Sequence, residues 1–231
     1  VGEIEVALRA GFSPRDIVFT GVGKTRAELE RAVGLDLAAI NAESPGEIER
    51  IAAIATASGV VARVAVRVNP DVDAGSHPHI STGLSATKFG VSGDDALHMI
   101  RDMTGRPGIK VVGLHVHVGS QITTLEPLIR AARTLVELAR AVSADGVALE
   151  HLDLGGGLGI AYEPGEAVVS VDDYAAALVS EVRPTGLTLV LEPGRWLVGP
   201  AGVLVATVVD LKRHLNGGWF VVVDAGMTDL V

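Results

Sequence analysis

The chain has 231 residues, of which 48% are hydrophobic, which is enough apolar sequence for the core of one large domain. Its net charge is −9, only 3% of its residues are aromatic and no cluster of Lys or Arg occurs, so we expect no nucleic-acid partner. It has no cysteine, which excludes disulfides and thiolate metal sites and favours a cytoplasmic location. No apolar run approaches the length that spans a bilayer, so we expect no membrane partner.

Short apolar runs alternate regularly with amphipathic helical stretches along most of the chain. This alternation is typical of βαβ units that build a parallel sheet. The predicted buried strands are residues 17–20, 37–41, 63–69, 111–118, 151–154 and 187–192. The pattern favours an α/β fold of the (β/α)8 TIM-barrel type, of which the first strands are missing.

Helices are predicted between these strands from their start and stop signals. Thr25 and Ser44 each have a Glu three positions later, so that a hydroxyl and a carboxylate can cap free backbone N–H groups. Gly34 and Gly59 are expected to end the two helices that follow. Further helices are predicted at residues 94–103, 125–142 and 172–182.

The pattern changes near Leu197, where two strand-like runs, residues 203–210 and 219–224, follow each other without an intervening helix. We therefore predict a partial barrel over residues 1–197 and the beginning of a second, β-type domain over residues 198–231. The chain starts at Val1 without Met and stops soon after a strand-like run, and we expect it to be an internal piece of a longer protein.

Polar residues are concentrated where the predicted strands finish. In a parallel barrel the C-terminal ends of the strands form the active-site face, so these side chains are candidates for function. The alternative is that they only cap strands, and for Asn41 the two interpretations have equal weight. The residues concerned are Asn41, Asn69, His117, Asp153 and Glu192.

His115 and His117 stand two apart on one predicted strand and therefore share a face. Such a pair can hold a metal only with further ligands from other strand ends. His151 begins its strand, and His77 and His79 fall in a polar loop, so none of these three is placed to complete a site. We expect no metal.

A second interpretation of the same segment is a cofactor site. The imidazole of His117 could pack flat on a planar ring, while the turn at Gly119 and Ser120 presents N–H and hydroxyl groups to an anion. For His115 alone, a histidine satisfied within the core remains an alternative.

Three consecutive glycines, Gly155, Gly156 and Gly157, follow the second-last predicted barrel strand. Glycine allows close backbone approach and positive φ angles, so successive N–H groups can converge on a phosphate. Barrels often bind phosphate at the loops after their last two strands, which favours this role over a simple tight turn.

The last predicted barrel strand ends in Glu192 and Arg195. Charges at a buried strand end need partners, and an ion pair between these two residues is one explanation. A cofactor that has both a ring nitrogen and a phosphate explains them better, because Glu192 can keep a pyridinium protonated while Arg195 binds the anion. Pyridoxal phosphate has both features.

Two further cations lie in apolar surroundings. Lys24 belongs to a GVGKT sequence that looks like the end of a phosphate-binding P-loop, but the glycine that this motif requires is replaced by Val18. Arg67 lies inside an apolar strand, and the sequence does not decide whether it points into the barrel or out towards the helices.

Residues 117–122 (HVGSQI), 152–160 (LDLGGGLGI) and 192–195 (EPGR), in this order and spacing, resemble the diaminopimelate decarboxylases. These belong to the pyridoxal-phosphate-dependent, alanine-racemase-like barrel decarboxylases. The resemblance extends along nearly the whole chain. Ornithine and arginine decarboxylases share the fold and the three motifs, but the sequences GSQI and LGI are more similar to the diaminopimelate branch.

The resemblance implies a role for each motif residue. His117 is expected to stack on the pyridine ring, Glu192 to act in catalysis by protonating the ring nitrogen, and Arg195 to contact the phosphate or a substrate carboxylate. Four residues are expected to hold the phosphate: Ser120, Gly155, Gly156 and Gly157. Gly194 is a further expected cofactor-binding residue.

The lysine that forms a Schiff base with the cofactor in this family lies at the end of the first barrel strand, which is upstream of Val1. None of the lysines here stands at a matching position, so none is assigned this role: Lys24, Lys88, Lys110 and Lys212. Later cysteine, arginine and tyrosine motifs of the family, some of them contributed across a dimer interface, would follow Val231.

The resemblance implies a cytoplasmic carboxy-lyase that is a homodimer at full length. It would convert meso-2,6-diaminopimelate to L-lysine, the last step of lysine biosynthesis, with pyridoxal phosphate. The alternatives are an ornithine- or arginine-type decarboxylase, a metal-dependent barrel hydrolase using His115 and His117, or a non-catalytic binding module. We expect the isolated 231 residues to be inactive and poorly stable, because an unclosed barrel exposes sheet edges.

Overall fold

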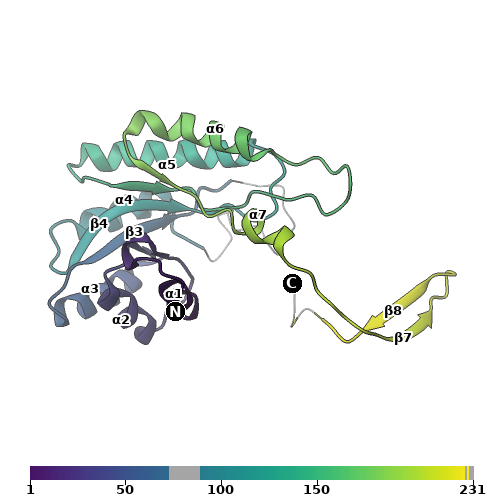
Figure 1. Cartoon of the computed structure of the whole chain (residues 1–231). Coiled ribbons are helices and arrows are strands. Elements are labelled where there is room, and N and C mark those ends of the chain that lie inside the picture. The colour runs from purple at the N-terminus through teal and green to yellow at the C-terminus, as the bar shows by residue number, and fades with distance from the viewer. Residues whose placement is uncertain (73–88, 227, 229–231) are drawn as a thin grey trace. The chain divides into compact units, whose positions relative to one another are not determined.

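The computed structural model describes residues 1–72, 89–226 and 228 (Figure 1). They belong to two compact units, Val1–Arg195 and Trp196–Val231. His77, His79 and Lys88 lie outside the described residues. The assignment of residues 1–197 and 198–231 to two domains stays a prediction.

The first unit contains one sheet of six parallel strands that lie in the order of the sequence. Consecutive strands are connected through a helix, as in a (β/α) barrel. The strands are β1 (Val18–Phe19), β2 (Ala39–Ala42), β3 (Ala62–Val68), β4 (Ile109–Val116), β5 (His151–Asp153) and β6 (Thr188–Val190). This part of a TIM-type barrel confirms the predicted fold class.

The helices of the first unit pack on the outer face of this sheet, and Figure 1 shows the long helices α5 and α6 beside each other. The helices are α1 (Gly2–Arg9), α2 (Arg26–Leu35), α3 (Pro45–Ala57), α4 (Gly93–Met103), α5 (Glu126–Ala144) and α6 (Val171–Val182). Within the described ranges, none of the helices has the length and apolar character needed to cross a bilayer.

The core between the sheet and its helices contains large apolar side chains from successive helices. Each such side chain is less than 2% exposed and contributes about 1.5–3 kcal/mol through its burial. One residue from each of α2 to α6 illustrates the pattern: Leu29, Ile51, Ile100, Leu135 and Leu178.

The predicted helix starts are confirmed. Thr25 Oγ1 accepts a hydrogen bond from the Glu28 N–H at 3.3 Å, and the Glu28 carboxylate accepts one from the Thr25 N–H at 2.8 Å. Together they form a capping box at the start of α2. Ser44 caps α3 through its hydroxyl alone, which accepts a hydrogen bond from the Glu47 N–H at 3.2 Å.

One of the two predicted helix ends is wrong. Gly34 lies within α2, which continues to Leu35, and the chain leaves the helix at Asp36 in the left-handed region with φ 56°. Asp tolerates this conformation better than most residues, so no glycine is needed there. Gly59, with φ 66°, follows the end of α3 as predicted.

The inner face of the half-barrel is lined by small residues near the strand starts. Ala39, Ala65 and Val112 form a separate buried cluster there. Gly113 belongs to the same face, and a Cβ on it would lie 2.5 Å from His151 Nε2, so its missing side chain makes room for the His151 ring. Small side chains here leave the space at the other end of the strands for polar groups.

Arg67 points towards this inner face, which resolves the question that the sequence left open. It shares the face with Ala65, two positions earlier on β3. Its guanidinium donates a hydrogen bond to the Glu43 carboxylate at 2.8 Å and lies 4.8 Å from the Phe89 ring centroid. Both members of this ion pair are almost fully buried.

Lys24 is part of a buried ion pair and not of a nucleotide site. Its ammonium group donates hydrogen bonds to Glu47 Oε1 at 2.7 Å and to the carbonyl oxygens of Gly21 and Asn41 at 2.8 and 2.7 Å. The side chains of Lys24 and Glu47 are 2% and 4% exposed. The pair therefore fixes the 21–25 turn against β2 and α3.

We predict that Lys24→Met destabilises the protein by about 3–5 kcal/mol, because the Glu47 carboxylate is then buried without its cation. Urea unfolding measures the change. Lys110→Met is the matched control, because Lys110 pairs with Glu150 at 2.7 Å but is 54% exposed. A surface pair contributes less than about 1 kcal/mol, so equal losses in the two variants would contradict the prediction.

The second unit contains an antiparallel hairpin of β7 (Val208–Arg213) and β8 (Trp219–Val223). The predicted strand at residues 203–210 is wrong in its bounds, because strand β7 starts and ends later. The turn fixes these bounds: His214 N–H donates to the Gly218 carbonyl at 2.7 Å, and Gly217 has φ 89°. Pairing with β8 then extends back from this turn only as far as Val208.

Candidate active site

Polar side chains converge at the C-terminal ends of β1 to β6, which we call the barrel mouth. The residues come from five strand ends and lie on the inner face: Thr20, Asn41, His115, Asp153 and Glu192. Asn69 follows the C-terminal end of β3, and its amide donates to the Phe89 carbonyl at 3.2 Å. All five predicted strand-end residues, which include His117, therefore lie at the C-terminal ends of the strands.

Asp153, Glu192 and His115 form a tight cluster. Their oxygen and nitrogen atoms lie within 4.8 Å of one another, and His115 Nε2 is 3.8 Å from Glu192 Oε1. Asp153 and His115 are completely buried, whereas the Glu192 side chain is 36% exposed. Two carboxyl groups at this distance repel each other when both are ionised, so they compete for one proton.

The pKa values of the two acids move apart. Burial, followed by the charge of Glu192, raises the pKa of Asp153 to about 8. For Glu192 burial acts against the anion, but the neighbouring His115 and Asp153 outweigh it and lower the pKa. The surroundings therefore favour the anion at Glu192 and the protonated form at Asp153.

A chain of hydrogen bonds connects Glu192 with the opposite edge of the sheet. Asn41 Nδ2 donates to Thr20 Oγ1 at 2.8 Å, and Thr20 Oγ1 donates to Glu192 Oε1 at 3.4 Å. Asn41 lies near the end of β2, whereas Thr20 and Glu192 follow β1 and β6. A hollow of about 460 Å³ opens between the edges of β1 and β6 and reaches Thr20 and Glu192.

His117 is held by the triple-glycine turn. Its Nδ1 accepts a hydrogen bond from the Gly156 N–H at 3.2 Å, so a proton on the neutral ring is carried by Nε2. Burial, with smaller effects from Arg67 and His115, lowers the pKa of His117 to about 4. The ring is therefore neutral at physiological pH and can stack on another planar ring.

The turn at Gly155, Gly156 and Gly157 admits no side chains. A Cβ on Gly156 would lie 2.0 Å from the Glu192 carbonyl oxygen, and Gly155 and Gly157 have φ angles of 64° and 106°. Gly155 N–H donates to Asp153 Oδ1 at 2.9 Å, and Gly156 N–H donates to His117. Among the described residues, only Gly157 of the three retains an N–H that is not donated to a protein atom.

Arg195 and Ser120 lie together beside this turn. Arg195 Nε donates to Ser120 Oγ at 3.2 Å, and its Nη1 donates to the Tyr162 hydroxyl. Arg195 follows Gly194, the first residue of α7 (Gly194–Val198). No ion pair joins Glu192 to Arg195 in the part of the chain that the structure describes, so that explanation of the two charges is wrong. A guanidinium, a hydroxyl and a free N–H form a donor set for an anion.

The two loops that carry these donors are joined by Gln121. Its side chain accepts from the Ile160 N–H at 3.2 Å and donates to the Ile160 carbonyl at 2.5 Å. Ile122 and Leu158 pair beside it as an isolated bridge. The histidine loop and the glycine loop therefore form one rigid platform.

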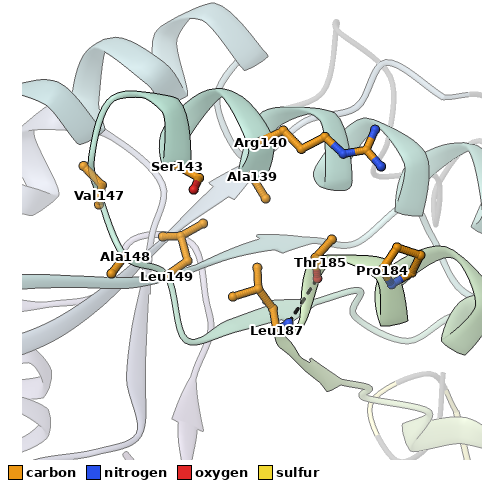
Figure 2. A pocket seen from close by; sticks show the side chains of 9 residues that line it. All are labelled: Ala139, Arg140, Ser143, Val147, Ala148, Leu149, Pro184, Thr185 and Leu187. Carbon is orange, nitrogen blue, oxygen red and sulfur yellow. Dashed lines mark hydrogen bonds between the residues drawn. The ribbon is translucent and has the colours of Figure 1, made fainter.

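A separate hollow of about 310 Å³ lies at the other end of the strands, between the end of α5 and the start of β6 (Figure 2). Figure 2 shows Arg140 and Ser143 from the helix above Leu187, whose N–H donates to Thr185 Oγ1 at 3.1 Å. The N-terminal ends of barrel strands serve stability, so we do not assign the active site to this hollow.

The family match covers most of the chain. Residues 1–199 match the family described as "Pyridoxal-dependent decarboxylase, pyridoxal binding domain". The chain belongs to this family. The predicted membership is therefore confirmed, and pyridoxal phosphate is the cofactor for which the domain is built.

Individual relatives agree with the family. A diaminopimelate decarboxylase of Neisseria meningitidis serogroup A is 45% identical over 230 residues, which are 100% of this chain and 56% of that protein. The crystal structure of diaminopimelate decarboxylase from Helicobacter pylori, complexed with L-lysine, is 41% identical with a TM-score of 0.91 and matches 99% of this chain and 57% of that one. Lysine/ornithine decarboxylase from Vibrio vulnificus, complexed with putrescine, is 25% identical with a TM-score of 0.78 over 98% and 57% of the chains. The chain spans a little over half the length of these relatives.

The side chains at the barrel mouth fit pyridoxal phosphate. The donors of Ser120, Arg195 and Gly157 suit its phosphate, the neutral ring of His117 suits its pyridine ring, and the anionic Glu192 suits a protonated ring nitrogen. Because the triple-glycine turn has no side chains, its backbone would be open to a bound phosphate.

The cluster of His115, Asp153 and Glu192 also has the composition of a metal site. Sequence reasoning searched only for further histidines and overlooked carboxylates from neighbouring strands. The family match describes residues 1–199 as a pyridoxal-binding domain. The expectation of no metal stays a prediction.

Asp153 was one of the predicted strand-end candidates but received no specific role, and Thr20 and Tyr162 were not predicted. For Asp153 a signal existed, because an acid at the end of an apolar strand directly before three glycines needs a partner. For Thr20 and Tyr162 no such signal existed, since their partners Glu192 and Arg195 are distant in sequence.

Proposed function

We propose that the whole protein decarboxylates meso-2,6-diaminopimelate to L-lysine with pyridoxal phosphate, as the last step of lysine biosynthesis. The observation that supports this most is that an anionic Glu192, a neutral His117 and the donor pair Ser120–Arg195 converge on one barrel mouth. Relatives named diaminopimelate decarboxylase are 33–45% identical to this chain, against 25% for the lysine/ornithine decarboxylase.

Each residue has a distinct task in this proposal. Bound pyridoxal phosphate supplies an electron sink for the negative charge that remains on the substrate carbon when carbon dioxide leaves. Glu192 keeps a proton on the ring nitrogen, and His117 packs against the ring. Ser120, Arg195 and the Gly157 N–H bind the phosphate, while Gly155, Gly156 and Gly194 give the backbone its shape.

The remaining parts of the proposal concern the complete protein. We infer an amino-acid substrate, a homodimer, a cytoplasmic location and no nucleic-acid or membrane partner. The residue that binds the cofactor covalently is a lysine outside this chain. Residues 1–197 belong to the cofactor-binding barrel and 198–231 to a β domain.

Side-by-side assays of carbon dioxide release from diaminopimelate, ornithine and arginine test the proposed substrate in the complete enzyme. We expect kcat/KM for diaminopimelate to exceed the values for ornithine and arginine by at least about a hundredfold. A site whose polar groups pair with one end of its substrate rejects analogues that lack the matching polar group. A preference for ornithine or arginine would establish the second candidate, a related decarboxylase of the same fold. Bound zinc without cofactor absorbance would indicate a hydrolase instead.

A further inference from the structure

Asp153 is a buried acid to which the proposed reaction gives no task. It lies at the end of β5 with 0% exposure, directly below the triple-glycine turn. Its Oδ1 accepts the Gly155 N–H at 2.9 Å, whereas its Oδ2 is buried and receives no hydrogen bond from the described residues. An ionised carboxylate would be costly in this position, because it needs donors at both oxygens.

One close neighbour of Asp153 is itself an acceptor. The Glu192 carboxylate belongs to the same cluster, in which all ligand atoms lie within 4.8 Å of one another. Glu192 also accepts a hydrogen bond from Thr20 Oγ1 at 3.4 Å and lies 3.8 Å from His115 Nε2. Two acceptors can adjoin each other in a buried site only if one of them carries a proton.

We propose that Asp153 is a positioning residue that keeps this proton on Oδ2 and donates it in a hydrogen bond to Glu192. Glu192 then remains an anion, and the hydrogen bond from Asp153 orients its carboxylate. The partly exposed side of this carboxylate faces the barrel mouth. The part of the proposal that concerns the cofactor's ring nitrogen rests on the proposed function. The shared proton itself does not.

The surroundings explain why the proton stays on Asp153 and not on Glu192. The Asp153 side chain is completely excluded from water, whereas the Glu192 side chain is 36% exposed and can be solvated as an anion. The titratable groups that act on the two acids are His115 and His117 from β4 and its following loop, and Tyr174 from α6. Burial lowers the pKa of both histidines, and burial raises the pKa of Tyr174 to about 12, so all three are neutral at pH 7. Glu192 is therefore the main charged neighbour of Asp153.

The proton on Asp153 makes stability depend on pH in a defined direction. The pKa of Asp153 is raised from 3.8 to about 8, so the folded state favours its protonated form. This contribution is complete below about pH 4 and is lost as the pH rises through about 8. Asp153→Asn removes the titration, so the stability of the wild type relative to this variant should fall between these pH values.

Infrared spectroscopy of the holoenzyme that contains this chain tests the proposal directly. The expected result is a carboxylic-acid C=O band at pH 7 that shifts in D2O and is absent from Asp153→Asn. Three results would overturn the proposal: no such band, a band that persists in Asp153→Asn but is lost in Glu192→Gln, or a stability difference that does not change with pH.

Kinetics of two variants then separate a donor from a simple structural residue. Asn can accept from the Gly155 N–H and donate its amide hydrogen to Glu192, so Asp153→Asn should keep kcat within about tenfold of the wild type. Asp153→Leu fills the space without a donor and should lose on the order of a hundredfold. Equal losses in both variants would contradict the donor role.

The two readouts also distinguish this proposal from the proposed function. If the acid band is present but no amino acid is decarboxylated, the shared proton stands and the assigned reaction is wrong. If decarboxylation occurs without the band, the reaction stands and Asp153 has no proton to donate.

Discussion

Glu192→Gln in the complete enzyme is expected to lower kcat by on the order of a hundred- to a thousandfold while the protein keeps its cofactor. Glutamine has nearly the same shape but cannot hold a proton on the ring nitrogen by its charge, and an unprotonated ring is a much poorer electron sink. The phosphate donors Ser120 and Arg195 are untouched, so binding should persist. Steady-state kinetics and the absorbance of the bound cofactor measure the two effects.

Glu137→Gln is the matched control for this prediction. Glu137 is an exposed acid on α5, so the same change of charge there should leave kcat within about twofold. The decisive outcome is the difference between the two variants. If Glu192→Gln turns over substrate at the control rate, Glu192 does not act on the ring nitrogen.

The contrast with Asp153→Asn sharpens this interpretation. Both substitutions replace an acid by its amide within the same cluster, yet we expect a large loss at Glu192 and a small one at Asp153. The asymmetry follows from the single proton: one residue acts as an anion and the other as a neutral donor. A general intolerance of amides in this cluster would affect both variants equally.

The strands of the fold could be predicted from the sequence because buried parallel strands are continuous apolar runs. All six predicted strands occur in the first unit, with ends that differ by a few residues. The helix α1 was missed, because it is short and buries only Ile4. The end of α2 was missed for a different reason, since Asp36 adopts a conformation that sequence rules reserve mainly for glycine.

The main side chains of the site could be predicted from the sequence, but their interaction partners could not. Glu192, His117 and Arg195 are recognisable in local motifs. The partners that set their protonation and direction come from other strands: Asp153 and His115 for Glu192, Gly156 for His117, and Ser120 and Tyr162 for Arg195. Such pairings depend on the register between strands, which no local pattern encodes.

The triple-glycine turn also depends on a residue distant in sequence, because it packs against the backbone of Glu192. We predict that Gly156→Ala destabilises the protein by about 3 kcal/mol. The added Cβ would lie 2.0 Å from the carbonyl oxygen of Glu192, so either the turn or the end of β6 must move. Because the Gly155 carbonyl also accepts the Glu192 N–H at 2.7 Å, this movement displaces the acid itself. Urea unfolding and cofactor titration should show loss of stability and at least tenfold weaker cofactor binding.

Gly34→Ala provides the opposite control. Gly34 lies within α2, where an added Cβ has nothing within 4 Å, so alanine should stabilise the helix by about 0.5–1 kcal/mol. The same substitution should thus have opposite signs at two glycines, since only one of them lies against the backbone of a neighbouring strand end. If Gly156→Ala is as stable as Gly34→Ala and binds the cofactor normally, the close approach of the turn to β6 is not what makes glycine necessary there.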